Sequence, residues 1–165
     1  MINYHQHMQR SLQAVTLAVL FAVKPVAGQT IPCADMLFLI EKSASDFQTI
    51  QAGSLTESGS YTTTTSLPDA DQCMILEDPE KRTYQCIWTY PLAAEEADTS
   101  FKTYTQEIGD CLGTRAELVP DTAVNHPDTY RSNLYQLTDT QVRITLKNKT
   151  TLKSTLVSVF VAKRR

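Results

Sequence analysis

The sequence predicts an α+β domain in which two helices pack on an antiparallel sheet, in the order α-βββ-α-βββ, stabilised by two disulfides. Two segments carry apolar residues at helical spacing, and each precedes segments in which apolar and polar residues alternate. The chain has 165 residues, of which 42% are hydrophobic and 20% charged, as in an ordinary globular domain. With five Gly and seven Pro, it belongs to neither the collagen-like nor the low-complexity classes.

The first 28 residues predict a secretory signal peptide that is not part of the fold. Arg10 precedes the apolar run 11–23, Lys24 ends it, and small residues stand at the expected cleavage site. The alternative is a membrane anchor, but a run of 13 residues is shorter than the roughly 20 that span a bilayer. We therefore expect one mature domain, 29–165, in the periplasm or outside the cell, with no stable membrane insertion after cleavage.

The first helix is predicted from Cys33 to Phe47, where apolar residues recur at helical spacing and Pro32 suits the first turn. A loop at 53–60 follows it. The next segment, 61–67, is rich in threonine and predicts a strand, because β-branched side chains fit a pleated surface.

A β-hairpin is predicted around the polar segment 77–82, which contains a proline. If the hairpin is centred between Pro79 and Glu80, Cys73 lies opposite Cys86. Directly opposed residues on antiparallel strands have Cβ atoms about 4.5 to 5.5 Å apart, so a cross-strand disulfide is within reach. The sequence therefore predicts the pair Cys73–Cys86.

The second helix is predicted at about 93–112, with acidic residues near its start and Gly113 at its end. Cys111 ends its apolar stripe, and Cys33 begins the stripe of the first helix. Two antiparallel neighbouring helices bring these cysteines together, which predicts the pair Cys33–Cys111. Metal ligation is the alternative, but the spacing lacks the close Cys pairs of zinc sites and the Cys-x-x-Cys of redox enzymes.

Three more strands are predicted at 130–137, 141–147 and 152–162, after a long connection, 114–128. The last strand is apolar at almost every position between 156 and 161. We therefore expect it at the centre of the sheet or covered on both faces.

The charges divide along the chain. Residues 29–128 carry 17 acidic and five basic residues, whereas 129–165 carry eight basic residues and one acidic residue. The interpretation we adopt is that the basic residues neutralise nearby acids or solvate the outer face of a hairpin; an interaction surface is the alternative. The basic residues concerned are Arg131, Arg143, Lys147, Lys149 and Lys153. The basic end of the chain, 163–165, is too short to predict nucleic-acid binding.

No catalytic residue, metal site or cofactor is predicted. His126 is the only histidine in 29–165, so mechanisms and metal sites that need two histidines are excluded. The sequence contains no Gly-x-Ser-x-Gly, no phosphate-binding glycine loop and no zinc helix motif. Adjacent carboxylates are explained by acidic turns and helix starts, although they could in principle act as acid and base. These pairs are Asp69 with Asp71, Asp78 with Glu80, and Glu95 with Glu96.

The threonine-rich strand is a candidate edge for a partner strand, because threonine fits a pleated surface without needing burial. The alternative is an ordinary strand that faces solvent. The candidate residues are Tyr61, Thr62, Thr63, Thr64 and Thr65.

These observations favour an exported, disulfide-stabilised binding module that engages a protein partner as an inhibitor, immunity factor, chaperone or envelope accessory. One alternative is a small secreted enzyme that uses His126 or an acidic pair. The other is a structural subunit of an envelope complex, joined by strand addition at the threonine-rich edge.

Overall fold

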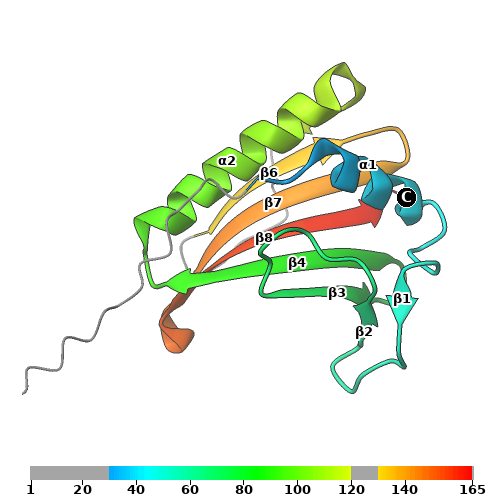
Figure 1. The fold of residues 1–165 in the computed structure, drawn as a ribbon, viewed down its shortest axis with the longest axis horizontal. Coiled ribbons are helices and arrows are strands. Elements are labelled where there is room, and N and C mark those ends of the chain that lie inside the picture. The colour runs from blue at the N-terminus through cyan, green and yellow to red at the C-terminus, as the bar shows by residue number, and fades with distance from the viewer. Residues whose placement is uncertain (1–29, 120–129, 165) are drawn as a thin grey trace, which may run out of the picture.

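The computed structural model describes residues 30–119 and 130–164, which form one eight-stranded antiparallel sheet and two α-helices (Figure 1). The expected signal peptide, 1–28, and His126 lie outside the described residues. Within the described part of the chain, neither helix is long and apolar enough to cross a membrane.

The chain forms two halves with the same order of elements, a helix followed by four strands. The first half contains α1 (Cys33–Ser43), β1 (Gln51–Ala52), β2 (Ser60–Thr63), β3 (Gln72–Glu77) and β4 (Arg82–Pro91). The second contains α2 (Glu95–Leu112), β5 (Glu117–Val119), β6 (Tyr130–Gln136), β7 (Thr140–Lys149) and β8 (Ser154–Lys163). Short 3-10 helices, Gly113–Arg115 and Thr150–Leu152, precede β5 and β8. The strand order across the sheet is β1-β2-β3-β4-β8-β7-β6-β5.

The α+β class with an antiparallel sheet is confirmed, but the predicted order α-βββ-α-βββ is wrong, because each half has four strands. The strands that the prediction lacked are β1, with two residues, and β5, with three. Two or three residues are too few to display the period-2 alternation from which a strand is recognised. The first helix is also shorter than predicted and ends at Ser43.

The last strand of each half joins the halves into one sheet. β4 and β8 pair antiparallel over nine residue pairs, from Thr83 opposite Ala162 to Pro91 opposite Ser154. The strand order is therefore symmetric about this seam. The predicted central position of the apolar last strand is confirmed, since β8 lies between β4 and β7.

The core lies between the helices and one face of the sheet. Trp88 of β4 packs on Tyr104 of α2, with ring centroids 4.8 Å apart, and α1 contacts β8 and β4. Burial of large apolar side chains is the main source of folding stability. The buried residues include, from the strands, Tyr84, Cys86, Trp88, Val142, Ile144, Val157, Val159 and Val161, and, from the helices, Met36, Leu39, Phe101, Tyr104 and Ile108.

The hairpin between β3 and β4 has the predicted register. The backbone N–H groups of Asp78 and Lys81 each donate to the other residue's carbonyl, at 3.1 Å, so the turn is centred between Pro79 and Glu80. Cys73 is consequently opposite Cys86, and the two form a disulfide.

A second disulfide, Cys33–Cys111, joins the first residue of α1 to the last turn of α2. Gly113 follows α2 with a φ of 51°, a conformation that glycine adopts without the strain a side chain would introduce. Both disulfides join the pairs that the sequence predicts.

Loss of the Cys33–Cys111 pair, by replacing both residues with serine, should lower the free energy of unfolding by about 4 kcal/mol, and loss of Cys73–Cys86 by about 3 kcal/mol. The order follows from chain entropy, because the bridges join residues 78 and 13 positions apart. Urea denaturation of the oxidised proteins measures both values. A larger loss from the hairpin bridge would contradict this explanation.

Candidate functional site

The sheet has a second face, directed away from the helices, which we call the distal face. A row of side chains crosses five strands on this face, because their residues lie opposite one another in the register. From β3 to β6 the row consists of Met74, Gln85, Phe160, Arg143 and Leu134. The next residue along each central strand points to the core instead, as Tyr84, Val159 and Ile144 do.

Two adjoining hollows lie on the distal face, with volumes of about 190 Å³ and 320 Å³. Both are lined by Arg143 and Phe160, which therefore stand at the boundary between them. The smaller hollow extends toward Lys81 at the β3–β4 turn. The larger extends along β7 and β8 toward Lys147 and Leu156.

Small side chains form the floor of the larger hollow. Ser158 and Thr145 lie opposite each other on β8 and β7 and are 4% and 5% exposed. Phe160 and Leu156 stand on either side of Ser158, two residues away on the same face. Because Ser158 and Thr145 have shorter side chains than Phe160 and Leu156, the surface is hollowed above them.

The rim of these hollows is cationic. Arg143, Lys147 and Lys149 occupy alternate positions of β7, so all three side chains project from the distal face. Lys81 lines the smaller hollow. No acidic residue occurs among the described residues that line either hollow.

The structure separates the basic residues of 129–165 into two groups. Arg131 lies on the helix side of the sheet, where it forms an ion pair with Asp98 of α2, and its guanidinium lies 4.9 Å from the centre of the Phe101 ring. Arg131 therefore has the neutralising role that the sequence predicts for these basic residues. Arg143 and Lys147 project instead from the face opposite the acidic helix α2.

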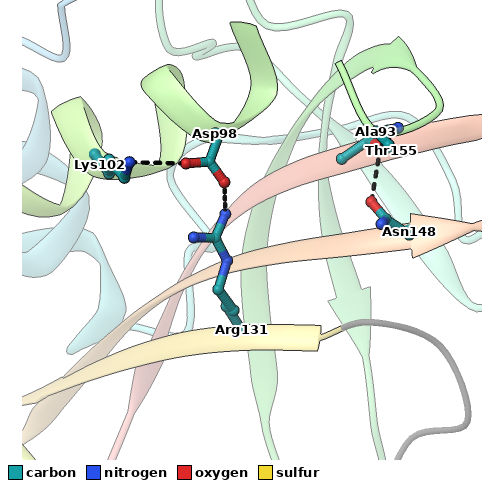
Figure 2. Close-up of polar contacts among 6 residues, drawn as sticks. All are labelled: Ala93, Asp98, Lys102, Arg131, Asn148 and Thr155. Carbon is teal, nitrogen blue, oxygen red and sulfur yellow. Dashed lines mark hydrogen bonds and ion pairs between the residues drawn. The ribbon is translucent and has the colours of Figure 1, made fainter. Parts of the chain in front are cut away.

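Polar contacts at the start of α2 form a second candidate site (Figure 2). Thr155 of β8, 1% exposed, accepts a hydrogen bond from the Ala93 N–H and donates one to Asn148 Oδ1, each at 2.8 Å. These bonds hold the chain before α2 against β7 and β8. Their role is therefore structural: they attach the start of α2 to the sheet.

Asp98 belongs to the same attachment. Lys102 Nζ lies 2.9 Å from one carboxylate oxygen, and Arg131 of β6 donates to the other (Figure 2). These two hydrogen bonds, first that of Lys102 and then that of Arg131, hold the pKa of Asp98 below its ordinary value. The carboxylate stays charged at neutral pH and joins α2 to the sheet.

Acidic residues gather near the β3–β4 turn, where Asp46, Glu77, Asp78 and Glu80 line a further hollow. Arg82 pairs with Glu77 at 2.6 Å, and the Glu80 N–H donates to Asp78 Oδ1. No group of three potential metal-binding residues occurs within residues 30–119 and 130–164.

Most of the carboxylates named from the sequence as possible acid–base pairs lie in turns, in a backbone hydrogen bond or at a helix start. Asp78 and Glu80 stand in the hairpin turn, Asp71 accepts a hydrogen bond from the Thr89 N–H, and Glu95 and Glu96 lie in the first turn of α2.

The predicted partner-binding edge, Tyr61 to Thr65, is not the outermost strand. β1 lies outside it, with Gln51 opposite Thr63 and Ala52 opposite Thr62. The Thr64 N–H donates to the Ile50 carbonyl at 2.9 Å. A partner strand could pair at this position only by displacing these contacts.

No protein-family model, curated protein or solved structure matches this chain.

The interaction surface that is the alternative for the basic residues includes Arg143, Lys147 and Lys149, but the sequence does not predict Phe160 or Leu156 as part of it. A signal was present, because Arg143, Lys147 and Lys149 occupy alternate positions, while Val142, Ile144 and Leu146 on the other face of the predicted strand are apolar. What the sequence lacked was the identity of the strands next to β7. Those neighbours place Phe160 beside Arg143.

Replacement of Thr155 by valine keeps the shape of the side chain but removes its hydroxyl. The Ala93 N–H and Asn148 Oδ1 then lose a partner at a partly buried position, so the free energy of unfolding should fall by about 1–3 kcal/mol in urea denaturation. The control Thr151→Val, at an exposed position between β7 and β8, should change it by less than about 0.5 kcal/mol. Equal stability of the two variants would rule out the proposed attachment.

Proposed function

We propose that the protein is an exported, disulfide-stabilised binding module that engages a protein partner through the distal face of its sheet. One observation carries this proposal: two adjoining hollows with a cationic rim share Phe160 and Arg143. Aromatic residues and arginine are enriched in protein interfaces and among the residues that dominate binding energy. The pair Phe160 and Arg143 is therefore the expected centre of the interface.

The shape of the distal face favours a protein partner over a small molecule. Small-molecule sites usually enclose the ligand and bury at least about 70% of its surface. Here the lining residues extend from the β3–β4 turn to Lys149 at the far end of β7. Five strands at about 4.8 Å spacing give a surface roughly 20 Å wide, which suits an extended contact.

Two disulfides support an oxidising compartment, since such bonds persist in secreted and periplasmic proteins and are rare in the cytosol. This agrees with the signal peptide that the sequence predicts at 1–28. We therefore place the binding module in the periplasm or outside the cell.

The two alternative functions receive less support from the described residues. A secreted enzyme would depend on His126, which lies outside them, or on carboxylates that occupy turns and helix starts. An envelope subunit joined by strand addition would have to displace β1 from Thr62 and Thr63. The distal face needs no rearrangement of the sheet to make contact.

The test is capture of a partner from envelope and secreted fractions by oxidised 29–165, compared with two phenylalanine variants. Phe160→Ala should weaken binding of the captured partner by roughly 30-fold, since truncation of a central aromatic costs about 2 kcal/mol or more. Phe38→Ala is the control, because Phe38 is 37% exposed on α1 and belongs to the other layer. It should bind as the wild type does.

Circular dichroism and thermal denaturation establish that both variants are folded before binding is compared. The proposal would be contradicted if the folded Phe160→Ala protein retained full affinity. It would also be contradicted if Phe38→Ala alone abolished capture, or if the reduced, unfolded chain captured the same partner equally well.

A further inference from the structure

We infer that Cys33–Cys111 is a redox-sensitive disulfide: it holds the start of α1 against α2, and its reduction releases this start while the sheet and α2 stay folded. The inference is independent of the proposed function, because the bridge lies in the helix layer and the distal face is the other side of the sheet. It follows from the exposure of the bridge and from the way in which the two ends of α1 are held.

The two disulfides differ in their exposure to solvent. Cys33 is exposed and Cys111 is half-buried, so their bridge lies at the protein surface. Cys86, in contrast, is fully buried, with the Tyr84 hydroxyl oxygen 3.1 Å from its sulfur. Its partner Cys73 is half-buried and packs against the core. Because a thiolate must reach a sulfur atom to break a disulfide, a dissolved thiol reacts with Cys33–Cys111 first.

The reaction is thiol–disulfide exchange with a dithiol reductant. A thiolate of the reductant attacks the exposed Cys33 sulfur and forms a new S–S bond, while the electron pair of the broken bond goes to the Cys111 sulfur, which takes up a proton. The second thiol of the reductant then displaces Cys33, which leaves as a thiolate and takes up the second proton. The bridge gains two electrons and two protons, and the dithiol becomes a cyclic disulfide. Since Cys33 is the first residue of α1, free N–H groups of the helix favour this thiolate.

The start of α1 has a weak attachment besides the bridge. The Ile31 N–H donates to Glu107 Oε2 of α2 at 2.8 Å, and the Ile31 side chain is 5% exposed. A hydrogen bond that is only partly buried contributes little net stability, because water replaces it in the released state. Once the bridge is reduced, this hydrogen bond and the burial of Ile31 remain to hold the start of α1 against α2.

The rest of α1 is held independently of the bridge. Met36 and Leu39 are fully buried in the core. The Ser43 hydroxyl donates to the Ile40 carbonyl at 2.7 Å and lies 2.8 Å from the Thr140 hydroxyl of β7. Reduction therefore frees the start of the helix without detaching its end from the sheet.

α2 is also attached to the sheet without the bridge. Asp98 forms an ion pair with Arg131 of β6, and the Tyr135 hydroxyl donates to the Thr105 carbonyl at 2.9 Å. Ile108 is 1% exposed and belongs to the core. The reduced state therefore keeps the sheet and α2, and the start of α1 is the element whose position the redox state controls.

Reduction under native conditions, followed by alkylation, tests which bridge reacts first. Oxidised 29–165 is treated with limiting dithiothreitol, its free thiols are blocked with N-ethylmaleimide, and the labelled cysteines are located by peptide mass spectrometry. We expect Cys33 and Cys111 to be labelled at least about tenfold faster than Cys73 and Cys86, because their bridge is the more accessible. Equal rates, or faster labelling of Cys73 and Cys86, would overturn the inference.

Hydrogen exchange measured by mass spectrometry tests the release of α1. The double variant Cys33→Ser, Cys111→Ser represents the reduced state. Its amides in 31–36 should exchange at least about tenfold faster than those of the oxidised wild type, while the amides of β4 are still protected when those of 31–36 have exchanged. The matched control Ala34→Ser, an exposed position beside the bridge, should exchange at 31–36 as the wild type does.

Two results would contradict the release. Exchange of 31–36 at the wild-type rate in the double variant would show that the bridge does not hold the start of α1. Loss of protection in β4 together with 31–36 would show that the bridge supports the whole fold. Release also requires reversibility: oxidised glutathione should restore slow exchange of 31–36 in the reduced wild type, and a failure to restore it would overturn the inference.

Discussion

The pairing of β4 with β8 is the constraint on which the rest of the structure depends. Each half of the chain is a helix followed by four antiparallel strands, and nine residue pairs along this seam join the two sets of strands. Because both strands are buried on the helix side, Tyr84, Trp88 and Val159 form one core with α1 and α2. The seam thus decides which face of the sheet the helices cover and which face is left for other contacts.

The separation of charge between the two layers follows from that arrangement. Half of the exposed residues of α2 are acidic, and Asp98 pairs with one of the bases, Arg131, which attaches the helix to the sheet (Figure 2). The alternate residues of β7 that point the other way are Arg143 and Lys147. In the sequence, acidic and basic residues are concentrated in different parts of the chain. In the fold, α2 carries acidic residues on one side of the sheet, and β7 carries basic residues on the other.

Local physical rules were sufficient for the hairpin and the disulfides. A proline-containing turn fixed the register that brings Cys73 to Cys86, and helical spacing placed Cys111 on the buried side of its helix. The shortest strands were missed because Gln51–Ala52 contains too few residues to alternate. The candidate site was missed for another reason: the neighbours of Arg143 come from β8 and β6, and strand order is set by tertiary packing.

Hydroxyl-radical footprinting of the complex with the captured partner tests the central claim that the distal face is the binding surface. Met74 and Phe160 are partly exposed on that face, and Phe38 is exposed on α1 in the other layer. The structure predicts that binding protects Met74 and Phe160 from oxidation while the oxidation of Phe38 is unchanged. Protection of Phe38, with Met74 and Phe160 oxidised as in the unbound protein, would contradict the claim.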